Sequence, residues 1–278
     1  MIARKNVPVA LTIAGSDSGG GAGIQADLKT FAALGVHGTS AIACLTAQNP
    51  KRVWGIEPCP PKMLRQQIEA VFEELNPRAV KTGMLNSAEN VSVVAGYFQN
   101  SKFEIRKLKL VVDPVLVSTS GTPLLELKAL KTLKEKLLPL ATLVTPNLSE
   151  AEMLSGQKIS SVEGMRSAAK TIHSEFGCAV LIKGGHLSGV LEAADIFFDG
   201  KTELLLSAPF VKGIHTHGTG CVYSAAICAA LALGRKLPEA VQIGKRFVTA
   251  AISESYRIGN HFALGSGIQK SGSRSRKN

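Results

Sequence analysis

Short apolar runs alternate with amphipathic segments along most of this 278-residue chain, and this alternation constrains the fold more than any other feature. The runs favour buried strands, which we expect at residues 9–14, 39–45, 79–81, 110–112, 143–145 and 179–182. Two intervening segments, residues 64–75 and 165–176, repeat apolar residues at helical spacing, and Gly177 is placed to end the second helix. Repeated strand–helix–strand order predicts an α/β fold in which helices cover both faces of a mostly parallel sheet.

The chain carries no break that would separate two domains. Residues 197–199 and 204–206 flank Gly200 and predict a hairpin at a late edge of the sheet. No internal repeat or linker precedes a short basic tail, so we expect one domain over residues 1–266. The tail, residues 267–278, is rich in serine, glycine and basic residues, and we expect it to be disordered.

Composition argues against several classes of protein. The sequence has no run of about 18 apolar residues, and its N-terminus lacks the features of a signal peptide, so we expect a cytoplasmic protein without a membrane span. Five cysteines without a C-x-x-C pair argue against a disulfide framework and a zinc ribbon. The formal net charge is +11, spread along the chain, which suits an anionic small ligand such as a nucleotide better than nucleic acid.

A glycine-rich loop, residues 15–23, follows the first predicted strand and leads into a helix. Ligands of such sheets bind beyond the carboxyl ends of the strands, and glycine lets a backbone approach them closely. The loop loosely matches a dinucleotide-binding fingerprint, but the next strand does not end in the acidic residue that this fingerprint requires. By itself the loop is equally compatible with a tight strand-to-helix turn.

Polar side chains also follow the later strands. Asp113 comes after the fourth predicted strand, and Asn147 and Glu150 come after the fifth. Carboxylates are ligands that Mg²⁺ prefers, so we expect Asp113 and Glu150 to hold this ion, directly or through water, and Asn147 to contact phosphate or the metal-bound water. Lys183, beside two glycines at the end of the sixth strand, suits phosphate neutralisation. Purely structural roles stay open for all three charged residues. Asp113 could simply form a turn before Pro114, Glu150 could face a helix dipole, and Lys183 could be a solvated lysine.

Residues 215–221, with the sequence HTHGTGC, carry the strongest signal for catalysis. A turn of small residues opens an alanine-rich helix, whose first backbone N–H groups form an anion hole. We predict Cys221 at the first helical position, where a thiolate is favoured and can accept a proton from a substrate hydroxyl. The alternatives are a Cys–His hydrolase pair, a zinc site that lacks a convincing fourth ligand, and a buried structural thiol.

Seven segments occur in the order typical of one family. They are AGSDSGGGAGIQAD (14–27), TAQN (46–49), KTGML (81–85), DPV (113–115), TPNLSEAE (145–152), KGGH (183–186) and THGTGC (216–221). Over about residues 9–255 the chain resembles the hydroxymethylpyrimidine and phosphomethylpyrimidine kinases of the ribokinase-like superfamily. The resemblance implies a three-layer α/β/α sandwich that uses ATP and Mg²⁺. It also implies two successive phosphorylations in thiamine biosynthesis, of the hydroxymethyl oxygen and then of the monophosphate.

The resemblance also implies roles for individual residues. The pyrimidine pocket would be lined by Gly15, Asp27, Thr46, Gln48 and Met84. The ATP site would include Asn147, Lys183, Thr216 and Thr219, with Asp113 and Glu150 at the metal. Catalysis would rest on Cys221, Lys183, Gly218 and Gly220. Cys221 stands where most of the superfamily has an aspartate, a difference typical of the pyrimidine kinases and of some pyridoxal kinases.

This chain departs from the family pattern at three places. Ser18-Gly19 replaces a common Pro-Ser or Pro-Thr, Thr46 replaces a frequent valine, and His215 replaces a usual asparagine. These differences bear on substrate preference rather than on phosphoryl transfer. The resemblance further implies a homo-oligomer, for which we expect a dimer, and it leaves a requirement for K⁺ open. Because the chain ends soon after the kinase region, we expect no fused second thiamine-pathway domain.

Two alternatives to the pyrimidine kinase stay open at this point. A pyridoxine or pyridoxal kinase of the same superfamily would share nearly every motif. A non-catalytic pyrimidine-binding sensor is the alternative from another class, but a sensor needs neither a metal site nor a base.

Overall fold

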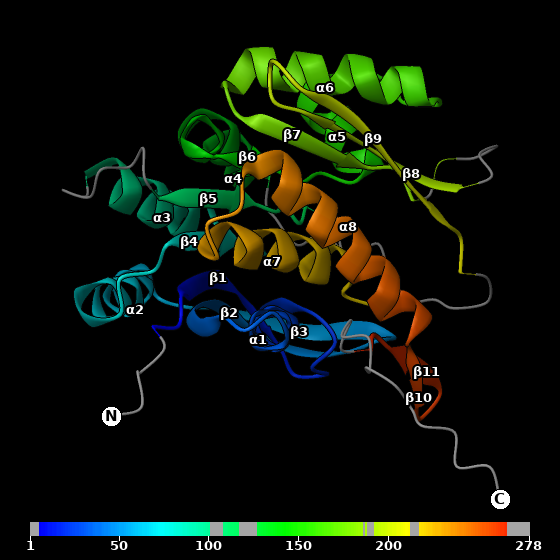
Figure 1. The fold of residues 1–278 in the computed structure, drawn as a ribbon. Helices are drawn as coiled ribbons and strands as arrows, with labels where there is room; N and C mark the ends of the chain where they lie inside the picture. Colours follow the sequence, from blue (N-terminus) through cyan, green and yellow to red (C-terminus); the bar gives the residue numbers. More distant parts are fainter. Residues whose placement is uncertain are drawn as a thin grey trace, which may run out of the picture.

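The computed structural model describes residues 6–100, 108–116, 127–185, 187, 192–211 and 217–265. Within these ranges nine strands form one sheet, in the order β3-β2-β1-β4-β5-β6-β7-β8-β9 (Figure 1). They are β1 (Val9–Asp17), β2 (His37–Asn49), β3 (Arg52–Pro58), β4 (Ala79–Thr82), β5 (Lys109–Val112), β6 (Leu143–Val144), β7 (Ala179–Lys183), β8 (Glu192–Phe198) and β9 (Glu203–Pro209). The neighbours in the central run β2-β1-β4-β5-β6-β7 pair in parallel, and the pairs β2–β3, β7–β8 and β8–β9 are antiparallel, which confirms the mostly parallel sheet.

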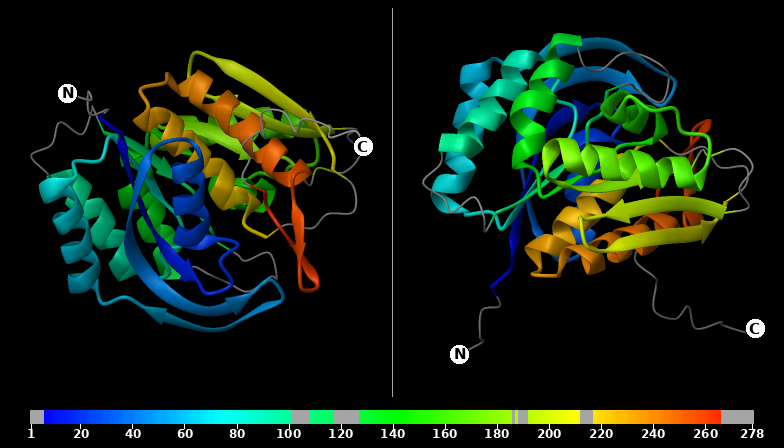
Figure 2. Two further views of the ribbon diagram at one scale, coloured as in Figure 1. Left: turned by 60° about the horizontal axis from the view of Figure 1, so that its bottom comes forward. Right: turned by 90° about the horizontal axis from the view of Figure 1, so that it is seen from above.

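Helices cover both faces of the sheet, as predicted (Figure 2). One layer contains α1 (Gly23–Ala33), α7 (Thr219–Ala232) and α8 (Leu237–Ser253). The other contains α2 (Pro61–Glu74), α3 (Ala88–Asn100), α4 (Leu127–Thr132), α5 (Leu148–Ser155), α6 (Val162–Phe176) and the short helices at Leu133–Leu137 and Leu138–Leu140. The chain therefore has the three-layer α/β/α architecture. The helix α6 ends at Gly177, which adopts a left-handed conformation (φ 74°) as C-cap.

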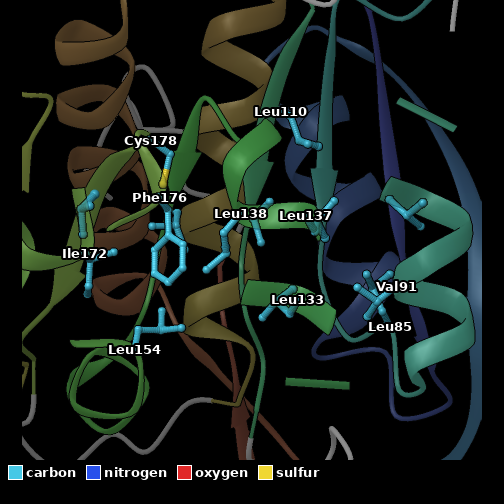
Figure 3. Packing of buried hydrophobic residues seen from close by; sticks show 14 of the residues in the cluster. Leu85, Val91, Leu110, Leu133, Leu137, Leu138, Leu154, Ile172, Phe176 and Cys178 are labelled. Carbon is cyan, nitrogen blue, oxygen red and sulfur yellow. The ribbon is translucent and has the colours of Figure 1, made fainter. Parts of the chain in front are cut away.

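Neighbouring residues of each central strand pack on opposite faces of the sheet. Val111 lies in the core beneath α1, α7 and α8, whereas Val112 lies in the core beneath the other helix layer. Both faces are covered, so the central strands are mostly apolar and do not alternate regularly with polar residues. Figure 3 shows the second of these cores, where Leu137, Leu138 and Phe176 pack between the helices and the sheet.

The sequence analysis does not predict three strands, β3, β10 (Tyr256–Ile258) and β11 (His261–Ala263). The side chains of β3 are mostly exposed and include Gly55 and Pro58, two residues unfavourable in strands, so the segment has no pattern of buried positions. The strands β10 and β11 form a small antiparallel ribbon after α8. The hairpin flanking Gly200 is confirmed as β8 and β9.

Some predicted features lie outside the described residues, namely His186, His215, Thr216 and the basic tail. Within the described part of the chain, none of the helices combines the length and the apolar character needed to cross a membrane.

Candidate active site

The carboxyl ends of β4 to β7 bring polar residues to one edge of the sheet. Asp113 directly follows β5, and Lys183 is the last residue of β7. Asn147, beyond the end of β6, still pairs with Lys183 through an isolated parallel bridge. The helix α7 begins at the same edge, where Ser224 donates a hydrogen bond to Asp113 (3.2 Å). The structure thus places Asp113, Asn147 and Lys183 together, although they are far apart in sequence.

Asp113 and Lys183 form a buried ion pair at this edge. The Lys183 Nζ donates to Asp113 Oδ1 at 2.9 Å, and Thr145 donates to the same oxygen at 3.2 Å. Burial opposes ionisation of Asp113, but the charges of Lys183 and Lys81 outweigh it and hold the pKa of Asp113 below its usual value. Burial also opposes the charge of Lys183, yet Asp113 and then Glu150 raise its pKa. Both groups are therefore charged at neutral pH.

Asn147 and Glu150 form a capping box at the start of α5. The Asn147 side chain accepts the Glu150 N–H at 2.9 Å, and the Glu150 carboxylate accepts the Asn147 N–H at 2.9 Å. The other Glu150 oxygen accepts the Leu116 N–H at 3.1 Å. Burial raises the pKa of Glu150, the Lys183 charge opposes this shift, and the Asp113 charge adds to it. Glu150 therefore has a structural role while it interacts electrostatically with the ion pair.

The donor set at this edge fits a magnesium ion. Mg²⁺ is usually bound by one or two carboxylates, together with water and substrate phosphates. Asp113 and Glu150 supply two carboxylates whose mutual repulsion a cation would relieve. Among the described residues, no group of three or more His, Cys, Asp or Glu side chains is arranged to hold a metal. Water and phosphate oxygens would therefore complete the coordination.

The turn before α7 packs against the glycine-rich loop. Gly218 is the N-cap of α7 and has a positive φ of 85°, which favours glycine. A Cβ on Gly218 would overlap the carbonyl oxygen of Gly21, so no larger residue fits without movement. A Cβ on Gly220 would lie 3.1 Å from Lys183 Nζ, which shows how closely this turn approaches the ion pair. The helix N-terminus, an anion-binding element, therefore faces the Asp113–Lys183 pair.

The position and ionisation of Cys221 differ from the sequence prediction. The helix begins at Thr219, so Cys221 is its third residue rather than its first. Burial raises the pKa of the thiol to about 11, although the Lys81 charge and the Gly23 N–H favour the thiolate. The thiol is therefore mostly neutral at pH 7, and the expected thiolate is wrong. Desolvation, with the Asp27 and Asp113 charges, outweighs these favourable contacts at this position.

Residues of the predicted pyrimidine pocket lie at the ends of β1, β2 and β4. A Cβ on Gly15 would lie 2.8 Å from Cys44 Sγ and 3.5 Å from Met84 Sδ, so glycine leaves room beside two sulfur atoms. Thr46 donates its hydroxyl to the Ser16 carbonyl at 2.9 Å. The backbone thus already satisfies the extra polarity of threonine at this position. Val115, packed beside Met84, has a positive φ of 47°, which is unfavourable for a β-branched residue and typical of functional sites.

Asp27 lies deeper than the other predicted pocket residues. It is fully buried, and Lys81 Nζ donates to its two carboxylate oxygens at 2.7 and 2.9 Å. Thr12 donates to the same carboxylate at 2.6 Å. Lys81 is also fully buried, so the two side chains form an ion pair within the molecule. Because both side chains are fully buried, this ion pair lies beneath the site rather than at its surface. Direct contact of Asp27 with a substrate stays a prediction.

A further polar cluster joins two segments that lie 200 positions apart in the chain. The Asp17 carboxylate accepts the N–H groups of Gly19, Gly21 and Ala22 at 2.8–3.1 Å, which fixes the glycine-rich loop. His217 Nε2 lies 3.2 Å from Asp17 Oδ2 and 2.9 Å from Gln48 Nε2. The residue before the anion-binding turn therefore contacts both the loop and a predicted substrate residue.

Sequence analysis missed four of the residues that build this site. Lys81 and Ser224 support the ion pairs, and Asp17 and His217 hold the loop and the turn. Lys81 opens the quoted motif KTGML but ends a short apolar strand run, and Ser224 lies within an alanine-rich helix, so neither was assigned a role. Asp17 and His217 were within quoted motifs, but their pairing spans 200 positions and leaves no local signal.

Comparison with known proteins identifies the family. The family profile described as phosphomethylpyrimidine kinase matches residues 17–265. The chain is 49% identical, over 90% of its length and 92% of the relative, to a hydroxymethylpyrimidine/phosphomethylpyrimidine kinase from Rhizobium meliloti. It is 47% identical to a thiamine biosynthesis bifunctional protein from Geobacter sulfurreducens over 90% of this chain, which spans about half the length of that relative.

Solved structures show the same architecture. A phosphomethylpyrimidine kinase from Clostridium difficile superposes with a TM-score of 0.77 at 42% identity, covering 89% of this chain and all of that one. A pyridoxal kinase from Staphylococcus aureus, in complex with AMP-PCP and pyridoxal, superposes with a TM-score of 0.83 at 34% identity, covering 95% and 94% of the two chains. The fold is therefore ribokinase-like, and the chain belongs to the phosphomethylpyrimidine kinase family of phosphotransferases.

Proposed function

We propose that this protein phosphorylates 4-amino-5-hydroxymethyl-2-methylpyrimidine with ATP, first to the monophosphate and then to the diphosphate, for thiamine biosynthesis. One observation carries most of the proposal: the N-terminus of α7 meets the Asp113–Lys183 pair at the sheet edge beside Gly15, Met84 and Gln48. An anion-binding turn, a cation and two carboxylates suit a triphosphate with its metal. The 44–49% identity to relatives named for this activity supports the choice of alcohol.

The proposed reaction is a direct displacement at phosphorus. The hydroxymethyl oxygen forms a bond to the γ-phosphorus of ATP while the bond to the ADP oxygen breaks, and the hydroxyl proton passes to the thiolate form of Cys221, which is the minor form at pH 7. Mg²⁺ at Asp113 and Glu150 would neutralise phosphate charge. Lys183 and the N–H groups of residues 218–221, including Gly220 and Thr219, would stabilise the transferring phosphoryl group. Asn147 would contact phosphate or water. We also place this reaction in the cytoplasm, where free thiols such as the five in this chain persist.

A direct turnover assay tests the proposal. The purified protein with ATP and Mg²⁺ is expected to convert hydroxymethylpyrimidine to both phosphate products, which mass spectrometry resolves. Absence of either product at saturating ATP would contradict the proposal. A second candidate is a pyridoxal kinase, because the Staphylococcus aureus pyridoxal kinase superposes on this chain at a TM-score of 0.83. Parallel kinetics with pyridoxal distinguish the two, and we expect the larger kcat/KM for the pyrimidine.

Removal of one carboxylate is expected to weaken metal binding. In the Glu150→Gln and Asp113→Asn variants, one negative charge near the cation is lost, so the Mg²⁺ concentration for half-maximal rate should rise by about tenfold, or ~1.4 kcal/mol. A Mg²⁺ titration at saturating ATP measures the change. Because Glu150 also caps α5, the melting temperature is measured in parallel. Unchanged titrations in both variants would remove these residues from the metal site.

Replacement of Gln48 by leucine is expected to reduce selectivity for the pyrimidine. Leucine leaves a polar atom of the substrate unpaired, which costs about 1–3 kcal/mol and lowers kcat/KM roughly 5- to 150-fold. ATP affinity should change little, since the phosphate site is built by other residues. Gln67→Leu is the matched control, because Gln67 is another partly buried glutamine, and its side chain bonds to the Ile42 backbone and to Cys59. A Gln48→Leu variant that is less stable but kinetically intact would contradict the role in binding.

A further inference from the structure

The contacts of His217 with Gln48 and Asp17 show which nitrogen of the His217 ring carries a proton and how the Gln48 amide is oriented. As placed, Gln48 Nε2 faces His217 Nε2 at 2.9 Å, while the same His217 nitrogen faces Asp17 Oδ2 at 3.2 Å. A carboxylate only accepts hydrogen bonds, so the His217–Asp17 contact requires a proton on Nε2. A side-chain NH₂ group only donates. Two donors cannot share one contact, and therefore only one of the two contacts can be a hydrogen bond in this arrangement.

The ionisation state of Asp17 decides which of the two His217 contacts is a hydrogen bond in this arrangement. The Asp17 oxygens accept the backbone N–H groups of Gly19, Gly21 and Ala22 at 2.8–3.1 Å, and hydrogen bonds of this kind favour the carboxylate. Asp17 is therefore a carboxylate at neutral pH and accepts a hydrogen bond from the Nε2–H of His217. Gln48 must then present its oxygen to His217, which means that its amide is turned by 180° from the placed orientation.

The turned amide lets the single Nε2–H of His217 form a three-centre hydrogen bond to Asp17 and Gln48, and it also removes a conflict at Thr46. As placed, the Thr46 hydroxyl faces two acceptors, the Ser16 carbonyl at 2.9 Å and Gln48 Oε1 at 3.3 Å, with one proton to donate. After the turn, Thr46 donates to Ser16 and accepts from the Gln48 NH₂ group. The backbone of Gln48 does not move, because the Ser18 hydroxyl bonds to its N–H and its carbonyl, both at 2.8 Å.

We propose that His217 is a positioning residue whose Nε2–H bridges Asp17 and Gln48, fixes the orientation of the Gln48 amide, and ties the anion-binding turn to the glycine-rich loop. The position of His217 supports the second part. It directly precedes Gly218, and its ring lies 3.2 Å from the place of a Cβ on Gly21. His217, which orients Gln48, is thus the residue next to the N-cap of α7. It therefore links the proposed alcohol-binding residue Gln48 to the proposed phosphate-binding turn. This proposal rests on the proposed function for its kinetic consequences only.

Two variants separate the hydrogen bond from the bulk of the ring. His217→Leu removes the donor, whereas His217→Gln keeps an N–H close to the position of Nε2. His37→Leu is the matched control, since His37 is exposed at the start of β2. The first measurement needs no substrate: hydrogen–deuterium exchange of the Gly19, Gly21 and Ala22 amides, which are bonded to Asp17. We expect about tenfold faster exchange in His217→Leu, as for the loss of one supporting hydrogen bond, and near-native exchange in His217→Gln and His37→Leu.

The second measurement is a double-mutant cycle with Gln48→Leu. If His217 acts through Gln48, His217→Leu should lower kcat/KM for the pyrimidine alcohol about 10- to 100-fold in the native background, and at least fivefold less in the Gln48→Leu background. His217→Gln should restore activity to within a few-fold. Equal losses in both backgrounds, together with unchanged exchange of the loop amides, would overturn the proposal. If the wild type does not phosphorylate the pyrimidine, the proposed function fails, but the exchange measurement still tests His217.

Discussion

Replacement of Cys221 by alanine is expected to lower kcat by about 10²–10⁴-fold, the usual cost of losing a general base, with little change in ATP affinity. Cys221 is the third residue of α7, next to the Lys81 and Asp27 charges and the Gly23 N–H. Cys228→Ala is the matched control, since Cys228 is a fully buried thiol on the same helix. Wild-type turnover by the alanine variant would remove Cys221 from the mechanism.

The pH dependence of the rate provides a second test of Cys221. Only the thiolate can accept a proton, and burial raises the pKa of this thiol to about 11. If the rate depends on the thiolate fraction, kcat should rise with pH between 6 and 9 without reaching a plateau. An aspartate is ionised throughout this range at its ordinary pKa of about 4. Cys221→Asp should therefore give a flatter profile, and parallel profiles for the two proteins would contradict the assignment.

Replacement of Lys81 by methionine is expected to destabilise the protein by about 3–5 kcal/mol, the usual cost of removing one partner of a buried ion pair. The side chains of Lys81 and Asp27 are both 0% exposed, and the loss of Lys81 would leave the Asp27 carboxylate without a counter-charge. Denaturant unfolding at pH 8 measures the change. Lys62→Met, on the exposed surface of α2, serves as the control and should change stability little.

The destabilisation should depend on pH in a defined direction. Burial already raises the pKa of Asp27, and Lys81 and Thr12 are the groups that oppose this shift. Without Lys81 the folded-state pKa must rise further above the unfolded value of about 3.9, so the folded state binds more protons. The variant should therefore lose less stability at pH 5 than at pH 8. The Lys81→Met/Asp27→Asn double variant lacks this group and should show no such difference between the two pH values.

The sheet could be predicted because its strands are buried on both faces. Continuous apolar runs such as those of β5 and β7 leave no ambiguity, and Gly177 marks the end of α6 through a backbone conformation that glycine favours. The strand β3 was missed because its pairing with β2 depends on main-chain hydrogen bonds rather than on buried side chains. Where packing does not select the residues of a strand, the sequence carries little signal for it.

The site could be predicted in outline but not in its ionisation. Motif order located Asp113, Lys183 and the turn at residues 218–221, which the fold then brings to one edge of the sheet. The neutral state of Cys221 depends on its partial burial and on the Asp27 and Asp113 charges that the fold places near it, which no local motif records. The same holds for Lys81, whose partner Asp27 is 54 positions away.

The link between Asp17 and His217 has a consequence for how the protein is made. The two residues are 200 positions apart, and the Gln48–His217 contact spans 169 positions. A ribosome that adds about 5–20 residues per second needs roughly 10–40 s to synthesise the intervening chain. During that interval the glycine-rich loop lacks the turn against which it packs. The candidate site is therefore expected to assemble late in translation, and a nascent chain that stops before α7 would lack one side of it.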